Sequence, residues 1–80
     1  MEFTNKTWVY DRTFNRFVCD ASDLNRPPGV PPSPNTVRDP WGQRALIFTA
    51  QRNTENEITR WEVTMKAPDE TWITLVIYND

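Results

Sequence analysis

The last apolar segment of the chain constrains the fold more than any other feature. Residues 71–78, Thr-Trp-Ile-Thr-Leu-Val-Ile-Tyr, carry no charge and would place apolar side chains on both faces of an extended strand. A strand with one face in water alternates apolar and polar residues, because successive side chains point to opposite faces. This segment does not alternate in that way. We therefore expect both of its faces to be covered, one by the core and the other by a second contact.

Two segments before it complete a predicted antiparallel sheet. Residues 58–67 alternate cleanly between apolar and polar side chains, and residues 44–52 form a further apolar run. The connections to the last strand, 71–79, are short, which favours antiparallel neighbours. The alternation predicts a core made of Ile73, Leu75 and Ile77 with Trp61, Val63 and either Leu46 or Ile47.

The amino-terminal quarter predicts a hairpin followed by a short helical turn. Residues 6–11 and 15–20 are rich in β-formers and are separated by a turn that begins at Asp11. Residues 20–24 predict a single helical turn, which cannot extend far because Pro27 disfavours a helical conformation at Arg26.

A proline-rich segment separates the hairpin from the other strands. Residues 26–42 hold six of the seven prolines and both glycines, so residues 27–42 predict a long extended loop. Within it, residues 39–42, Asp-Pro-Trp-Gly, predict a turn that fixes the position of Trp41. Two interpretations remain open: a strap packed on the chain's own tryptophans, or a Pro-x-x-Pro ligand for another domain.

These elements predict one small all-β domain over residues 1–80. We expect a five-stranded, mainly antiparallel sheet that is curled or closed into an SH3-like barrel, with the Pro-rich loop and at most one short helical turn. The alternative is an open sheet with a short helix from residues 20–26 lying across one face.

Composition argues against several classes of function. The net charge of −2 and the pI of about 5.0 disfavour a nucleic-acid binder, which usually carries a basic excess. There is no histidine, a single cysteine and no clustered acidic motif, so we expect no enzyme, no metal site and no cofactor. The absence of a signal-like run or a long apolar span predicts a cytoplasmic protein that does not enter a membrane.

The remaining expectation is a non-enzymatic module that binds another protein. Small size, acidity and the lack of a catalytic signature are typical of phage and mobile-element proteins, and an inhibitor or adaptor that occludes a partner protein would suit such a chain. The alternatives are a homo-oligomeric, virion-type structural component and a small nucleic-acid-binding β-barrel. The predicted partner-binding residues are Trp41, Trp72, Val76, Tyr78, Arg26 and Arg38.

The face of the last strand that points away from the predicted core is the expected site of contact with a partner. Trp72, Val76 and Tyr78 alternate with the predicted core residues and would form an apolar patch beside water. We expect this face to be buried by residues 27–41 folding back with Trp41 as the anchor, by a second subunit, or by a foreign partner.

Overall fold

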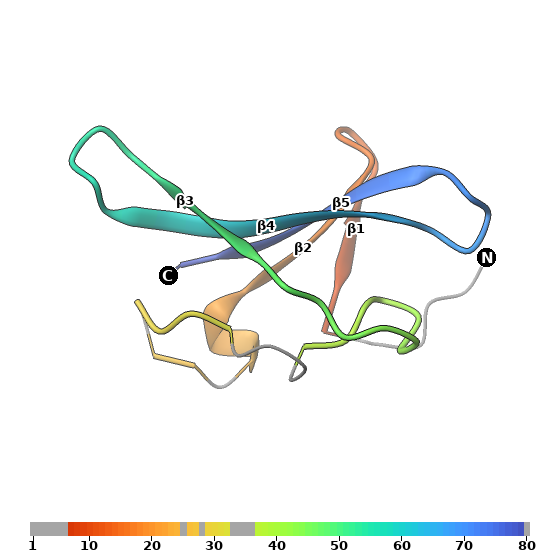
Figure 1. Cartoon of the computed structure of the whole chain (residues 1–80), viewed down its shortest axis with the longest axis horizontal. Helices are drawn as coiled ribbons and strands as arrows, with labels where there is room; N and C mark the ends of the chain where they lie inside the picture. The colour runs from red at the N-terminus through yellow and green to blue at the C-terminus, as the bar shows by residue number, and fades with distance from the viewer. Residues whose placement is uncertain (1–6, 25, 28, 33–36, 80) are drawn as a thin grey trace.

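A five-stranded sheet forms the centre of the molecule. The computed structural model describes residues 7–24, 26–27, 29–32 and 37–79. In this part of the chain the strands pair in the order β1-β2-β5-β4-β3 (Figure 1). Their bounds are β1 Val9–Asp11, β2 Arg16–Asp20, β3 Thr49–Arg52, β4 Ile58–Lys66 and β5 Trp72–Tyr78, with one 3₁₀ turn, η1, at Ala21–Leu24.

The sheet is mixed because β2 pairs with β5 in parallel. Phe17 lies opposite Leu75 and Cys19 opposite Ile77, whereas the other three strand pairs are antiparallel. Parallel neighbours need a long connection that returns the chain to the same end of the sheet. Here the connection includes η1, a long irregular segment and the β3–β4 hairpin. The prediction of a mainly antiparallel five-stranded sheet is therefore confirmed, with this one exception.

The sheet is open. Strands β1 and β3 stand at the two ends of the strand order and do not pair with each other in the described part of the chain. The closed form of the predicted barrel is therefore not observed, and the open-sheet alternative describes the arrangement better. The predicted helical turn over residues 20–24 is confirmed as the 3₁₀ turn η1 at Ala21–Leu24.

One face of the sheet carries the hydrophobic core. Alternate residues of β2, β4 and β5 point to this side, which we call the core face. Leu75 and Ile77 at its centre are 0% and 1% exposed, and the predicted choice between Leu46 and Ile47 resolves to Leu46. The other buried members from the strands are Phe17, Cys19, Trp61, Met65 and Ile73, with Val63 partly buried.

An irregular segment covers the core face. Residues 37–48 pass beneath the sheet in the view of Figure 1 and contribute Val37, Trp41 and Leu46 to the core. The segment folds on itself, because the Leu46 amide donates to the carbonyl of Val37 at 3.0 Å. This pairing explains why the predicted strand over 44–52 is too long. Residues 44–48 turn away from β4, and only Thr49–Arg52 joins the sheet.

A buried aspartate shapes the covering segment. The predicted turn over residues 39–42 is present, with the Gly42 amide donating to the carbonyl of Asp39 at 2.9 Å. The side chain of Asp39 is 1% exposed, and its Oδ1 accepts hydrogen bonds from the amides of Trp41 and Gln43. An aspartate that bonds its own backbone two residues ahead stabilises such a turn. Asp39 therefore holds Trp41 over the sheet.

The described part of the proline-rich loop is anchored at the carboxyl-terminal end of β5. The Gly29 amide donates to the side-chain oxygen of Asn79 at 2.7 Å, and Asn79 in turn donates to the carbonyl of Ile58 at 2.8 Å. Pro28 and residues 33–36 lie outside the described residues, so the Pro-x-x-Pro interpretation remains a prediction.

Candidate protein-binding surface

The opposite side of the sheet, which we call the second face, is built from the remaining alternate residues. Its rows follow from the register: Arg16 of β2 lies beside Thr74 of β5, and Val18 lies beside Val76. On β4 the same face carries Arg60, Glu62, Thr64 and Lys66 opposite β5 residues Tyr78, Val76, Thr74 and Trp72. Charged side chains of β2 and β4 therefore flank the uncharged central strand β5 on this face.

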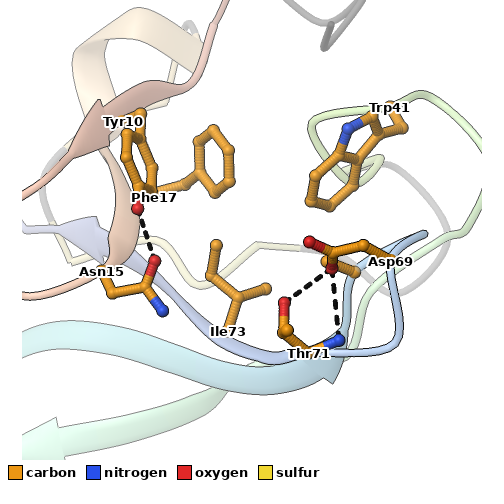
Figure 2. A pocket seen from close by; sticks show the side chains of 8 residues that line it. Tyr10, Asn15, Phe17, Trp41, Asp69, Thr71 and Ile73 are labelled. Atoms are coloured by element: carbon orange, nitrogen blue, oxygen red, sulfur yellow. Dashed lines mark hydrogen bonds between the residues drawn. The ribbon is translucent and has the colours of Figure 1, made fainter. Parts of the chain in front are cut away.

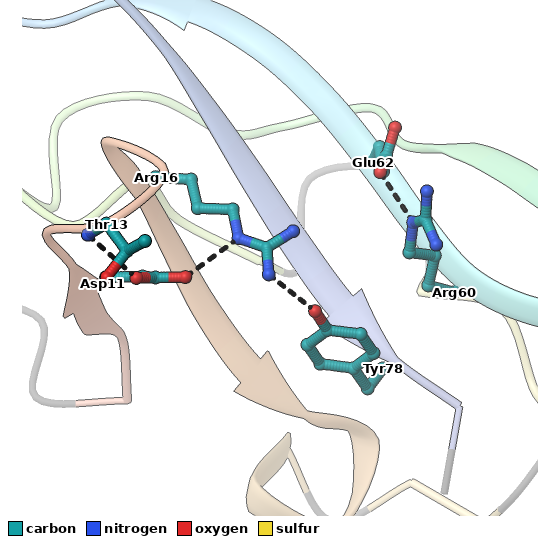
Figure 3. Close-up of polar contacts among 6 residues, drawn as sticks. All are labelled: Asp11, Thr13, Arg16, Arg60, Glu62 and Tyr78. Atoms are coloured by element: carbon teal, nitrogen blue, oxygen red, sulfur yellow. Dashed lines mark hydrogen bonds and ion pairs between the residues drawn. The ribbon is translucent and has the colours of Figure 1, made fainter.

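Arg16 joins three strands across the second face. Its Nε donates to Asp11 Oδ2 at 3.1 Å, and its Nη2 donates to the Tyr78 hydroxyl at 2.9 Å (Figure 3). The hydrogen bond to Asp11, followed by the nearby Tyr78, raises the pKa of the Arg16 guanidinium above its usual value. The guanidinium also lies 4.9 Å from the centre of the Phe14 ring, within cation–π range.

This contact explains how the middle of the second face is covered. Val76 is 0% exposed, although it points away from the core face. Arg16 and Tyr78 lie on either side of the Val18–Val76 row, so the hydrogen bond between their ends spans this row. Long side chains with apolar stems cover apolar surface while their polar ends stay near water. The chain therefore covers Val76 with side chains of the same face.

The predicted strap over this face is wrong. Trp41 packs edge-on against Phe17, with ring centres 5.5 Å apart, and both belong to the core cluster. The irregular segment therefore covers the core face. Alternation within β5 indicates two apolar faces, but it carries no information about the side on which a distant connection crosses.

Trp72 remains open to solvent at one end of the second face. It is 62% exposed, and its described neighbour is Lys66, whose Nζ lies 5.5 Å from the ring centre. Phe14, which precedes β2 at the same end of the sheet, is 68% exposed. Val9 on the edge strand β1 is 63% exposed. The predicted binding residues did not include Phe14, Val9 or Arg16. For Phe14, the available sequence signal was an aromatic side chain inside a polar turn.

The other predicted binding residues do not join this surface. Arg26 donates to the carbonyl of Pro31 at 2.9 Å within the proline-rich loop. Arg38 is exposed on the covering segment, and its carbonyl accepts the indole N–H of Trp8 at 3.0 Å. Of the six predicted residues, Trp72, Val76 and Tyr78 share the second face, with Trp72 and Tyr78 at opposite ends of β5. The prediction of Val76 as a binding residue is wrong, because Val76 is 0% exposed.

A cavity of about 200 Å³ opens beside Trp41 on the other side of the sheet. Figure 2 shows it between the β1–β2 hairpin, the covering segment and the β4–β5 turn. Its lining is Tyr10, Asn15, Phe17, Trp41, Ala67, Asp69, Thr71 and Ile73.

Chemistry-bearing side chains are sparse in the described part of the molecule. It contains no group of three or more histidine, cysteine or acidic residues arranged to hold a metal ion. Cys19, the single cysteine of the chain, is a buried core residue. No helix in the described ranges has the length and apolar character needed to cross a membrane.

Comparisons with known proteins add no relative to this description. No family model matches the chain, and neither the curated proteins nor the solved structures include a significant match.

Proposed function

We propose that this protein is a non-enzymatic module that binds another protein through the second face of its sheet. The observation that carries the proposal is Trp72, which is 62% exposed on the central strand β5. Tryptophan is enriched at the energetic centres of protein interfaces, because it buries a large apolar area while offering one polar group. Phe14 lies at the same end of the sheet and is 68% exposed, with the Arg16 guanidinium 4.9 Å from its ring centre.

The charge distribution supports a protein partner over a nucleic acid. The strands present Arg16, Arg60 and Lys66 on the second face against Asp11, Asp20 and Glu62. Phosphate binding depends on an excess of positive charge, which this surface does not have. Mixed charges around an apolar centre are the usual rim of a protein interface. Occlusion of a partner's own working surface, as an inhibitor or adaptor of phage or mobile-element origin would do, fits a module of this size.

A homo-oligomeric structural role is the second candidate, and the edge strands favour it. β1 and β3 end the sheet with unpaired backbone groups on their outer sides in the described part of the chain. Exposed edges are sites where a second copy can add its own strand. Sedimentation of the purified protein separates the candidates, because the protein-binding module sediments as a monomer and the structural component as an oligomer.

The test compares two exposed apolar residues on different parts of the molecule. Ile47 is 73% exposed on the covering segment and serves as the control for Trp72. Tagged wild type, Trp72→Ala and Ile47→Ala are used to recover bound proteins from the native host, with quantification by mass spectrometry. We expect one protein in stoichiometric amount with wild type and Ile47→Ala, reduced at least about tenfold with Trp72→Ala. Equal recovery with all three proteins would contradict the proposal.

A further inference from the structure

The cavity beside Trp41 has an aromatic wall. Tyr10 and Phe17 lie with ring centres 5.1 Å apart, and Phe17 contacts Trp41 at 5.5 Å. The Tyr10 ring remains 38% exposed, and its hydroxyl donates to the side-chain oxygen of Asn15, which fixes the ring at the cavity rim (Figure 2). Faces and edges of three aromatic rings around one space form the type of site that attracts organic cations.

A carboxylate stands across the cavity from these rings. Asp69 Oδ1 accepts hydrogen bonds from the Thr71 hydroxyl at 2.6 Å and the Thr71 amide at 3.2 Å. These bonds lower the pKa of Asp69 below its ordinary value, so the side chain is negatively charged at neutral pH. Figure 2 shows its other oxygen turned toward the cavity. The ion pairs Arg16–Asp11 and Arg60–Glu62 do not involve Asp69.

We propose that this cavity binds a lysine-type alkylammonium group presented by a partner protein. The aromatic rings and the apolar side chains of Ile73 and Ala67 accommodate the methylene stem, and the Asp69 carboxylate receives the ammonium. One oxygen facing the cavity suits a single point charge, whereas the planar guanidinium fork of arginine pairs best with both carboxylate oxygens. The preference for an alkylammonium group is inferred from the residues that line the cavity. That a partner protein presents this group rests on the proposed function.

The chain offers a matched control for the charge. Glu70 is the next residue, carries a carboxylate, is also exposed and does not line the cavity. Asp69→Asn and Glu70→Gln therefore remove the same charge from neighbouring positions. Removing a charged hydrogen-bond acceptor from a site weakens binding by roughly tenfold.

The experiment titrates the full-length protein with n-butylammonium and follows it by ¹H–¹⁵N NMR. We expect signals of Tyr10, Trp41 and Thr71 to shift in a saturable manner at millimolar ligand. The affinity should fall at least about fivefold in Asp69→Asn and stay unchanged in Glu70→Gln. n-Butanol, which has the same stem without the charge, should bind at least about fivefold more weakly, and n-butylguanidinium should also bind more weakly than the ammonium.

Several outcomes would overturn the proposal. Equal affinity for n-butanol would identify an apolar cavity without preference for a cation. Tighter binding of n-butylguanidinium would assign it to arginine. If n-butylammonium caused no saturable NMR shifts, the cavity would not bind the ammonium. If Asp69→Asn and Glu70→Gln weakened binding equally, Asp69 would not be a specific part of the site. Trp72→Ala should bind n-butylammonium normally, so failure here is distinguishable from failure of the second-face interface.

Discussion

The two faces of one strand, β5, are covered in different ways. Leu75 on the core face lies beneath a separate segment of chain, residues 37–48, which a buried aspartate folds into shape. Val76 on the second face is equally inaccessible, but its cover consists of side chains from the same sheet surface. Further along that surface the cover ends, and Trp72 faces solvent. A strand that is apolar on both faces therefore needs both of them covered. One face can be covered by a separate segment of chain and the other by side chains of the sheet itself.

The largest effect should come from the core face. Leu75→Ala creates a cavity beneath the covering segment and should lower the free energy of unfolding by about 2–5 kcal/mol. Val76→Ala removes two methyl groups from the next residue, under a cover that can readjust, and should cost about 1.5 kcal/mol. Urea unfolding of the two variants measures the difference. Equal losses would contradict the distinction between the two covers.

The covering segment itself should depend on Asp39. Asp39→Ala leaves the amides of Trp41 and Gln43 without their acceptor in a buried turn, which should cost about 1–3 kcal/mol. Asp39→Asn keeps an oxygen at the same position and should retain most of the stability. Unfolding followed by tryptophan fluorescence provides the comparison. If alanine and asparagine were equivalent at this position, the hydrogen bonds would not be what holds the turn.

On the second face, Arg16 should matter more than Arg60. Arg16→Ala removes the bonds to Asp11 and Tyr78 together with the cover of Val76, and should cost about 1 kcal/mol. Arg60 pairs with Glu62 at 2.6 Å, but its side chain is 41% exposed, so Arg60→Ala should cost about 0–0.5 kcal/mol. Thermal unfolding under identical salt conditions tests the ranking. A reversed order would mean that Arg16 does not cover the row beneath it.

A gain in stability, rather than a loss, is expected at the turn that leads into β5. Glu70 adopts a φ of 70°, a left-handed conformation that is costly for a residue with a side chain. Glu70→Gly should therefore stabilise the protein by about 0.5–1 kcal/mol, whereas Glu70→Ala should not. Calorimetry of the two variants is sufficient. A loss of stability with glycine would show that the Glu70 side chain makes a contact worth more than the strain.

Sequence patterns within single strands predicted the antiparallel strands β4 and β5 and the core residues that they carry. The alternation in residues 58–66 and 72–78 identified β4, β5 and the buried members of the core, because a strand's two faces are encoded within the strand itself. The parallel pairing of β2 with β5 was missed, since it joins segments more than fifty residues apart. The choice of face for the covering segment was missed for the same reason.

The candidate surface was predictable only in part. Trp72 was expected on an apolar face covered by residues 27–41, by a second subunit or by a foreign partner; Trp41 packs in the core instead, and Trp72 is exposed. Val76 is 0% exposed, and the hydrogen bond that spans its row joins Arg16 and Tyr78, which are 62 positions apart in the sequence. No pattern within either segment indicates such a pairing, so the prediction overestimated the size of the open apolar patch.

Indole hydrogen exchange tests the contrast between the faces most directly. Each of the four tryptophans gives one indole N–H signal. Those of Trp41 and Trp61 are shielded from water, that of Trp8 donates to the carbonyl of Arg38, and Trp72 is open. After transfer to D₂O, we predict that three signals persist and one disappears at once, with Trp72→Phe identifying the missing one. Immediate exchange of Trp41 together with Trp72 would contradict the account, because the core face would then lack its cover.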